Sequence, residues 1–187
     1  MNTSKRPRIW KGDGRKGNGW RLTGWTAALA LLTMPAIAMR FTSEVNWTAT
    51  DFVFAAVLLA LLGGGLELAA RFAGARPRAL GIAVATLAAF LTLWANAAVG
   101  LIGSEQASVN RGFTLLVFVG FSSAALFRLR PVPMRWILGL IAMGQPTLGI
   151  AARYIMPGHA VEWGVVAFFT LLWGMAAGCF HVAARRV

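Results

Sequence analysis

The sequence predicts an all-α fold, an integral membrane bundle of about six transmembrane helices with both termini in the cytoplasm. Composition is the first reason, because 58% of the 187 residues are hydrophobic and only 13% are charged. Globular domains average about 45–50% apolar and about 25% charged residues. A domain of this size buries only about two-thirds of its surface in water, so it cannot hide this much apolar material. The other reasons are the lengths of the apolar segments and the distribution of the arginines.

Six continuous apolar segments follow one another along the chain, and each is close to the roughly 20 residues that cross the hydrocarbon core as a helix. The predicted spans are residues 24–41, 52–70, 79–104, 112–127, 134–156 and 161–184. Apolar residues do not alternate with polar ones in these segments, which favours helices over the strands of a membrane barrel. The connections are short and carry proline or glycine, so successive helices are predicted to be antiparallel neighbours.

The basic residues are divided unequally between the two sides of the predicted membrane span. Of the 18 Lys and Arg, all but Arg40, Arg111 and Arg153 fall on the side of the two termini and of residues 71–78 and 128–135. The opposite side also gathers four acidic residues, Glu44, Asp51, Glu105 and Glu162. Because cytoplasmic loops are enriched in Lys and Arg, we expect the arginine-rich side to face the cytoplasm and the chain to lie in the cell inner membrane.

Residues 1–23 form a basic, glycine-containing segment that is predicted to be a disordered cytoplasmic tail, and residues 24–187 form the bundle. Such a tail should bind anionic lipid at the membrane surface. Nucleic-acid binding is not expected, because the sequence contains no recognised nucleic-acid-binding module. An alternative is that residues 1–38 are a cleaved signal peptide ending in Ala36-Ile37-Ala38, which would leave five spans and an external N-terminus.

Three stretches carry a resemblance to a known group of proteins. They are Phe41-Thr-Ser-Glu-Val-Asn-Trp-Thr48, Glu67-Leu-Ala-Ala-Arg71 and Trp94-Ala-Asn-Ala-Ala-Val-Gly-Leu-Ile-Gly-Ser-Glu105. On these motifs the chain resembles an uncharacterised family of small bacterial multi-pass inner-membrane proteins with about six spans. The resemblance implies the membrane fold and carries no activity with it.

Polar residues within the spans are the first candidates for function, because ionisable groups in lipid are costly and often functional. Glu67 precedes Arg71 by one helical turn near the cytoplasmic end of the second span. The pair predicts either a structural ion pair at positions i and i+4 or a group that handles protons or cations. Asn96 in the third span predicts a hydrogen bond between helices, and Gln145-Pro146 in the fifth predicts a kink.

The external ends of the predicted helices gather chemically varied side chains, which include the candidates Glu105 and Arg111. The full set is Arg40, Glu44, Asn46, Asp51, Ser104, Glu105, Asn110, Arg111, Arg153, His159 and Glu162. These residues are either a solvated rim with weak ion pairs or a site for a ligand or partner.

Catalytic, metal and cofactor motifs are not found in the sequence. It contains no zinc-protease helix, P-loop, dinucleotide fingerprint or nucleophile elbow. The two histidines, His159 and His181, are predicted on opposite sides of the membrane, and Cys179 is the single cysteine. We therefore expect no catalytic residue, no metal, no cofactor and no enzymatic activity.

Small residues recur four positions apart on several predicted helices, which lets helix backbones approach closely in lipid. Examples are Ala56, Ala60 and Gly64 in the second span and Gly174 and Gly178 in the sixth.

The leading hypothesis is a non-enzymatic accessory or interaction component that binds a membrane-protein partner or a second copy of itself. The alternatives are a small ion or solute transporter that uses Glu67 and, third, an enzyme that acts on lipid through the external polar cluster.

Overall fold

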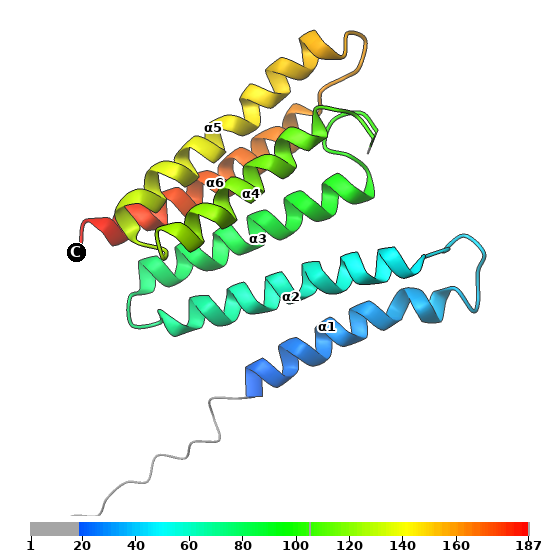
Figure 1. Cartoon of the computed structure of the whole chain (residues 1–187), viewed down its shortest axis with the longest axis horizontal. Coiled ribbons are helices and arrows are strands. Elements are labelled where there is room, and N and C mark those ends of the chain that lie inside the picture. Colours follow the sequence, from blue (N-terminus) through cyan, green and yellow to red (C-terminus); the bar gives the residue numbers. More distant parts are fainter. Residues whose placement is uncertain (1–18, 105, 187) are drawn as a thin grey trace, which may run out of the picture. The chain divides into compact units, whose positions relative to one another are not determined.

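The computed structural model describes residues 19–104 and 106–186. Six helices cover most of this part of the chain, and Figure 1 labels them in order. They are α1 (Gly19–Ala38), α2 (Ala49–Arg71), α3 (Arg76–Ala98), α4 (Asn110–Leu126), α5 (Pro131–Ile155) and α6 (Trp163–Ala184). The chain divides into a first unit that contains α1 and a second unit, from residue 47 onward, that contains α2–α6. The all-α prediction is confirmed.

Helix α1 begins at Gly19, earlier than the predicted start at residue 24, so residues 19–23 are helical rather than part of a disordered tail. The rest of the predicted tail, residues 1–18, lies outside the described residues. None of the residues of α1 is buried, and large apolar side chains such as Leu22 and Met34 are mostly exposed. The signal-peptide alternative for this segment stays a prediction.

The start of α2 is set by a capping box. The Thr48 backbone N–H donates to Asp51 Oδ2 at 2.7 Å, and the Asp51 N–H donates to Thr48 Oγ1 at 3.4 Å. This reciprocal arrangement satisfies two donors that the first turn of a helix would leave unpaired. The helix therefore begins at Ala49, a little before the predicted span at residue 52.

Helix α3 ends at Ala98, well before the predicted end of the third span at residue 104. The reason is local backbone geometry, because Gly100 and Gly103 adopt positive φ angles of 76° and 67°. Residues in that conformation do not continue a right-handed helix. The apolar residues Leu101 and Ile102 are buried in the connection instead, at 4% and 1% exposure, and this is why they resembled part of a span.

Helix α5 runs without interruption from Pro131 to Ile155, through Pro146. Pro131 and Pro133 lie in its first turn, where the missing backbone N–H costs nothing. Gln145, beside Pro146, is completely buried. Gln145-Pro146 therefore lies inside a continuous helix, and the kink expected there stays a prediction.

In the second unit, α3, α4, α5 and α6 form a closed ring of antiparallel neighbours, and α2 packs mainly on α3 (Figure 1). Close approaches show the pairing. A Cβ on Gly81 of α3 would lie 2.8 Å from Phe180 of α6, and one on Gly144 of α5 would lie 2.8 Å from Leu116 of α4. The side chain of Thr86 on α3 lies directly against Gly65 of α2. The centre of the ring is filled by large side chains, among them Phe113, Trp173 and Phe180.

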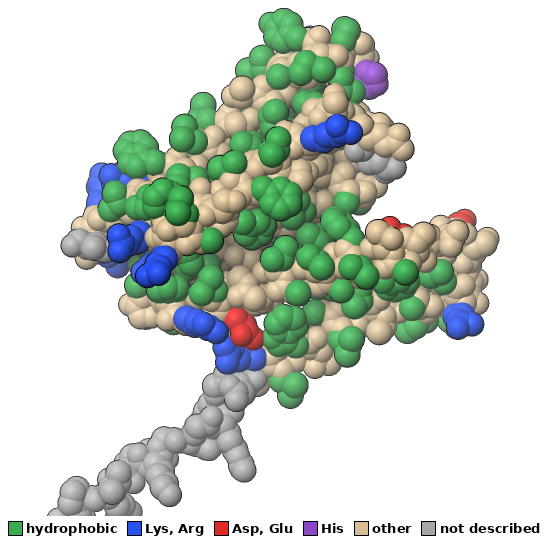
Figure 2. Space-filling view, viewed as in Figure 1, with side chains coloured by type: hydrophobic (Ala, Val, Ile, Leu, Met, Phe, Trp, Pro, Cys, Tyr) green, Lys and Arg blue, Asp and Glu red, His purple; other side chains and the backbone are tan. Residues whose placement is uncertain are grey.

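Three helices, α2, α3 and α6, are both long and apolar enough to cross a membrane. Helix α4 is apolar but has only 17 residues. Helix α5 carries Gln145 and Thr147 around its proline, and α1 carries Arg21 and Pro35. A membrane location is therefore supported by three spans rather than the six predicted. Hydrophobic side chains cover much of the molecular surface between the ends of these helices (Figure 2).

Candidate functional site

A polar network joins the end of α3, the connection after it and the start of α4. The Asn96 side-chain amide donates to the Asn110 carbonyl at 2.7 Å and to Thr114 Oγ1 at 2.8 Å. These bonds link α3 to α4 across the second unit, as the sequence predicted for Asn96. The Asn96 Oδ1 atom is buried and has no hydrogen-bond partner among the described residues.

Asn110 is the centre of this network, and it is only 2% exposed. Its Oδ1 accepts from the Ile102 N–H at 3.1 Å, and its Nδ2 donates to the carbonyls of Ile102 and Ser104 at 3.2 and 2.8 Å. One side chain thus pairs both the N–H and the carbonyl of Ile102, and it adds a second donor to the Ser104 carbonyl, which also accepts from the Ala107 N–H at 3.0 Å. The assignment of Asn110 to a solvated external rim is wrong, because this amide is a structural hub.

The connection between α3 and α4 requires glycine at position 100. Its φ angle is 76°, and a Cβ there would lie 2.6 Å from the Ser104 carbonyl carbon and 2.8 Å from Asn110 Nδ2. Any larger residue would therefore displace the amide that holds the connection. The network is consequently built by a turn glycine and a buried asparagine acting together.

An open cavity of about 540 Å³ lies beside this network, between α2, α3 and α4. Asn96, Asn110, Thr114 and Arg111 supply its polar lining, and Phe54, Leu93, Leu115 and Phe118 are among its apolar residues. Two of the five predicted site residues, Asn96 and Arg111, are therefore brought together. Thr114 is a site residue that the sequence analysis did not name, and Asn110 was named only within the set of external polar residues. The signal for Thr114 was the helix period, because it follows Asn110 by one turn.

The other predicted site residues do not join this cavity. Glu67 and Arg71 lie in the last two turns of α2. Phe54, which lines the cavity from the same helix, is about 20 Å from Glu67 at the rise of an α-helix. The ion pair between Glu67 and Arg71 stays a prediction. Glu105 lies outside the described residues.

A second cavity, of about 270 Å³, lies between α2 and the ring of four helices. Small residues line it, including Ala60 and Gly64 of α2 and Ala85 of α3, with Trp173 and Phe180 of α6 deeper in the unit. A Cβ on Gly64 would meet nothing within 4 Å, whereas one on Gly65 would overlap Thr86. Adjacent glycines thus have different roles, since Gly65 allows α2 to dock on α3 and Gly64 leaves space beside it.

Polar groups in the centre of the ring are few, and they bond to their own helices. Thr92 Oγ1 donates to the Ala88 carbonyl at 2.7 Å, and Gln145 Nε2 donates to the Ile141 carbonyl at 3.4 Å. Gln145 Oε1 and Trp173 Nε1 are buried and have no partner among the described residues. An unsatisfied acceptor and an unsatisfied donor of this kind each lower the stability of the fold.

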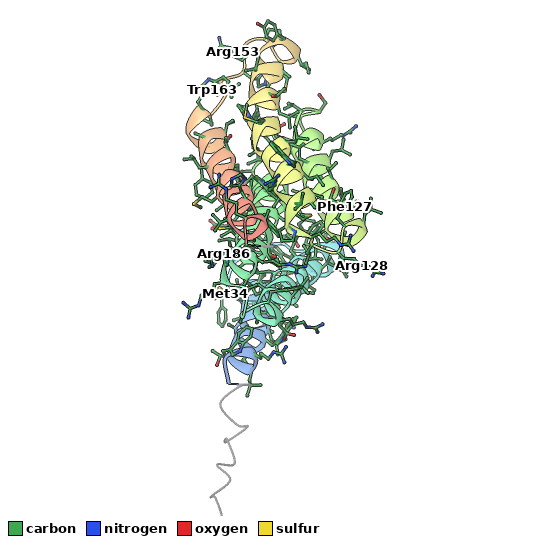
Figure 3. All side chains as sticks on the ribbon, turned by 90° about the vertical axis from the view of Figure 1, so that its left-hand side faces the viewer. Met34, Phe127, Arg128, Arg153, Trp163 and Arg186 are labelled. Atoms are coloured by element: carbon green, nitrogen blue, oxygen red, sulfur yellow. The ribbon has the colours of Figure 1, made fainter. Side chains whose placement is uncertain are left out.

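Arginine side chains gather at one end of the second unit. Figure 3 shows Arg128 and Arg186 at that end and Arg153 at the other. The arginines of the first end are Arg71, Arg76, Arg78, Arg128, Arg130, Arg135, Arg185 and Arg186. Arg78 is held there, because its Nη2 donates to the Arg128 carbonyl at 3.1 Å and its guanidinium carbon lies 4.0 Å from the centroid of the Phe72 ring. The antiparallel fold thus brings together charges that are far apart in the sequence.

The described residues contain no cluster of His, Cys, Asp or Glu side chains suited to hold a metal ion. What the described arrangement offers is a cavity beside α2, a larger and mostly apolar cavity with a few polar groups beside Asn110, and a basic end. Comparison with protein families, with curated proteins and with solved structures finds no match for the chain, so the family resemblance stays a prediction.

Proposed function

We propose that the chain is a six-span inner-membrane protein, with both termini in the cytoplasm, that acts as a non-enzymatic accessory or interaction component. The arginines at one end of the second unit support this orientation, since cytoplasmic ends are enriched in Lys and Arg. The opposite end carries Arg111 and Arg153 together with Asp51 and Glu162. The family resemblance on the three quoted motifs points to the same membrane architecture.

The observation that carries the interaction role is the open face of α2. Only Ala55, Leu58 and Ala69 are buried on this 23-residue helix. In the most apolar stretch of 18 residues, 17% of the residues of α2 are buried, against 33% in the same length of α6. Because small residues let helices approach closely in lipid, the face around Ala60 and Gly64 suits another transmembrane helix, from a partner protein or a second copy.

A packed ring favours this role over transport through the bundle. Phe113, Trp173 and Phe180 fill the centre, and each is at most 2% exposed. A transporter remains the second candidate because the cavity beside Asn96 and Arg111 has polar groups and room for a small solute. That candidate predicts that the wild-type protein moves a solute in proteoliposomes and that Asn96→Leu abolishes this flux. It fails if neither the wild-type protein nor the variant moves any tested ion or solute.

Site-specific photocrosslinking in cells tests the interaction role. A photoreactive amino acid at Leu61, which lines the cavity beside α2, should form a protein adduct whose mass identifies a partner or a second copy. The same label at Leu171, on the exposed face of α6, is the control and should react only with lipid. Lipid adducts alone from both positions would contradict the proposal.

A matched pair of glycine substitutions sharpens the same test. Gly64 and Gly139 are helical glycines at which a Cβ would meet nothing within 4 Å. Gly64→Leu should abolish the Leu61 adduct, because the new side chain occupies the face that receives the partner helix. Gly139→Leu on α5 should leave the adduct unchanged, and an equal effect of the two would argue for a general loss of folding.

A further inference from the structure

A pocket of about 360 Å³ lies at the arginine-rich end of the second unit, separate from both cavities described above. Its residues come from the connection before α3, the first turn of α3, the start of α5 and the end of α6. Arg76, Arg78 and Arg186 supply its charged groups, and Pro131 and Ala183 are among its other residues. None of the described residues that line it is acidic. We propose that this pocket binds the phosphate of an anionic phospholipid headgroup.

Charge is the first argument. Three guanidinium groups with no carboxylate among the described lining residues leave a positive potential, and planar guanidinium groups match phosphate oxygens well. Arg78 is fixed in place by its bond to the Arg128 carbonyl and by its position over the Phe72 ring. A guanidinium that is already ordered loses less entropy when it binds an anion.

Backbone groups add to this potential. The first turn of α3 lies in the pocket, and its N-cap, Ala75, has no side chain that could accept a hydrogen bond from the first N–H groups. The start of α5 also lies there and has no side-chain cap, and because Pro131 and Pro133 have no N–H to donate, it contributes mainly through its helix dipole. The amino ends of helices carry a partial positive charge that favours anions.

Position in the bilayer is the argument for a lipid rather than a soluble anion. Trp136, in the second turn of α5, is 65% exposed, and the Arg135 guanidinium carbon lies 5.1 Å from its ring centroid. Exposed tryptophan beside arginine is typical of the headgroup level of a membrane. Leu80, one turn into α3, is 58% exposed and offers an apolar surface for an acyl chain beneath the pocket. Basic pockets between the cytoplasmic ends of spanning helices are suited to acidic headgroups.

The inference requires that the second unit lies in a membrane with this end at the headgroups, but it does not require the partner role of α2. The full-length protein in detergent micelles would be titrated with phosphatidylglycerol, or with phosphatidylcholine of the same acyl chains, and bound lipid counted by native mass spectrometry. The wild-type chain should retain phosphatidylglycerol in preference to phosphatidylcholine. Millimolar inorganic phosphate, added as a competitor, should not displace the lipid.

Two double variants separate a defined pocket from a general attraction of basic protein for acidic lipid. Arg76→Gln/Arg186→Gln removes two exposed arginines of the pocket and should weaken phosphatidylglycerol binding by about tenfold or more. Arg128→Gln/Arg185→Gln removes two exposed arginines from the same end outside the pocket, and should weaken binding by less than about threefold. Both keep the basic N-terminal segment, and neither removes a side-chain contact that the structure describes.

Three results would overturn the proposal. Equal weakening by the two variants would show diffuse electrostatic attraction. Equal retention of the two lipids by the wild-type protein would show no headgroup selectivity, and displacement by inorganic phosphate would show a site for a soluble anion. Crosslinking from α2 is read independently of these measurements, so failure of one proposal is distinguishable from failure of the other.

Discussion

Helices α2 and α6 are alike in sequence and different in the fold. Both are long, strongly apolar and interrupted by small residues. Yet α6 buries seven residues, from Val166 to Ala183, against α3 and α5, whereas α2 buries three and packs mainly on α3. An apolar face in lipid is stable against hydrocarbon and against protein alike, so composition alone does not tell which of the two it will contact.

What separates the two helices is the shape of the facing surface. Phe169, Trp173 and Phe180 of α6 fill the ring from inside, and Gly81 on α3 makes room for Phe180. On α2 the small residues Ala60 and Gly64 face a cavity instead. Large side chains therefore hold α6 within the ring, and absent side chains leave α2 with one main neighbour, α3, among the helices of the second unit.

The largest expected effect is a loss of packing inside the ring. Phe180→Ala should lower the free energy of unfolding by about 3 kcal/mol, because a fully buried aromatic side chain leaves a cavity. The Leu171 side chain on the same helix is 68% exposed, so Leu171→Ala should change the free energy of unfolding by less than about 0.5 kcal/mol. Unfolding by titration with a denaturing detergent measures both, and similar values for the two would break the comparison.

The next effect concerns the connection that closes the ring between α3 and α4. Asn110→Ala should cost about 2 kcal/mol, since it leaves the buried N–H and carbonyl of Ile102 without their side-chain partner. Hydrogen exchange followed by mass spectrometry should show faster exchange in residues 99–109 and unchanged exchange in α2. Unchanged protection of residues 99–109 would contradict the role given to Asn110.

Docking of α2 on α3 is expected to depend on one glycine. Gly65→Ala should cost about 1–2 kcal/mol, because its Cβ overlaps Thr86, and Gly64→Ala should cost less than about 0.5 kcal/mol. Adding Thr86→Ala to Gly65→Ala should restore much of the loss in the same unfolding assay. If the two alanines have equal effects, or if Thr86→Ala gives no rescue, close contact at Gly65 does not hold α2.

The smallest effect is expected at Gln145, in the centre of the ring. Its amide makes one long hydrogen bond and leaves Oε1 unsatisfied, so Gln145→Met should be neutral or stabilise by up to about 1 kcal/mol. Gln145→Ala, which leaves a cavity at the same position, is the control and should destabilise by about 2 kcal/mol. A clear loss of stability in Gln145→Met would show that the amide has a partner that this account omits.

The helices and most turns could be predicted from the sequence because apolar length and proline position report directly on backbone structure in lipid. The end of α3 could not, because Leu101 and Ile102 are as apolar in a buried connection as in a helix. Asn110 was placed on the surface because nothing local shows that its amide pairs with backbone earlier in the chain. Asn96 was recognised, since a lone amide in an apolar helix has few uses other than a bond to a neighbour.

Labelling of single cysteines tests the central claim, a membrane bundle whose arginine-rich end faces the cytoplasm. In a Cys179→Ser background, cysteine would replace Gly74, between α2 and α3, or Ser108, between α3 and α4, both of them exposed. With intact bacterial cells whose outer membrane has been made permeable, an impermeant maleimide should label Ser108→Cys and should reach Gly74→Cys only after the inner membrane is opened. Labelling of Gly74→Cys in intact cells, or recovery of the protein from the soluble fraction without detergent, would contradict the account.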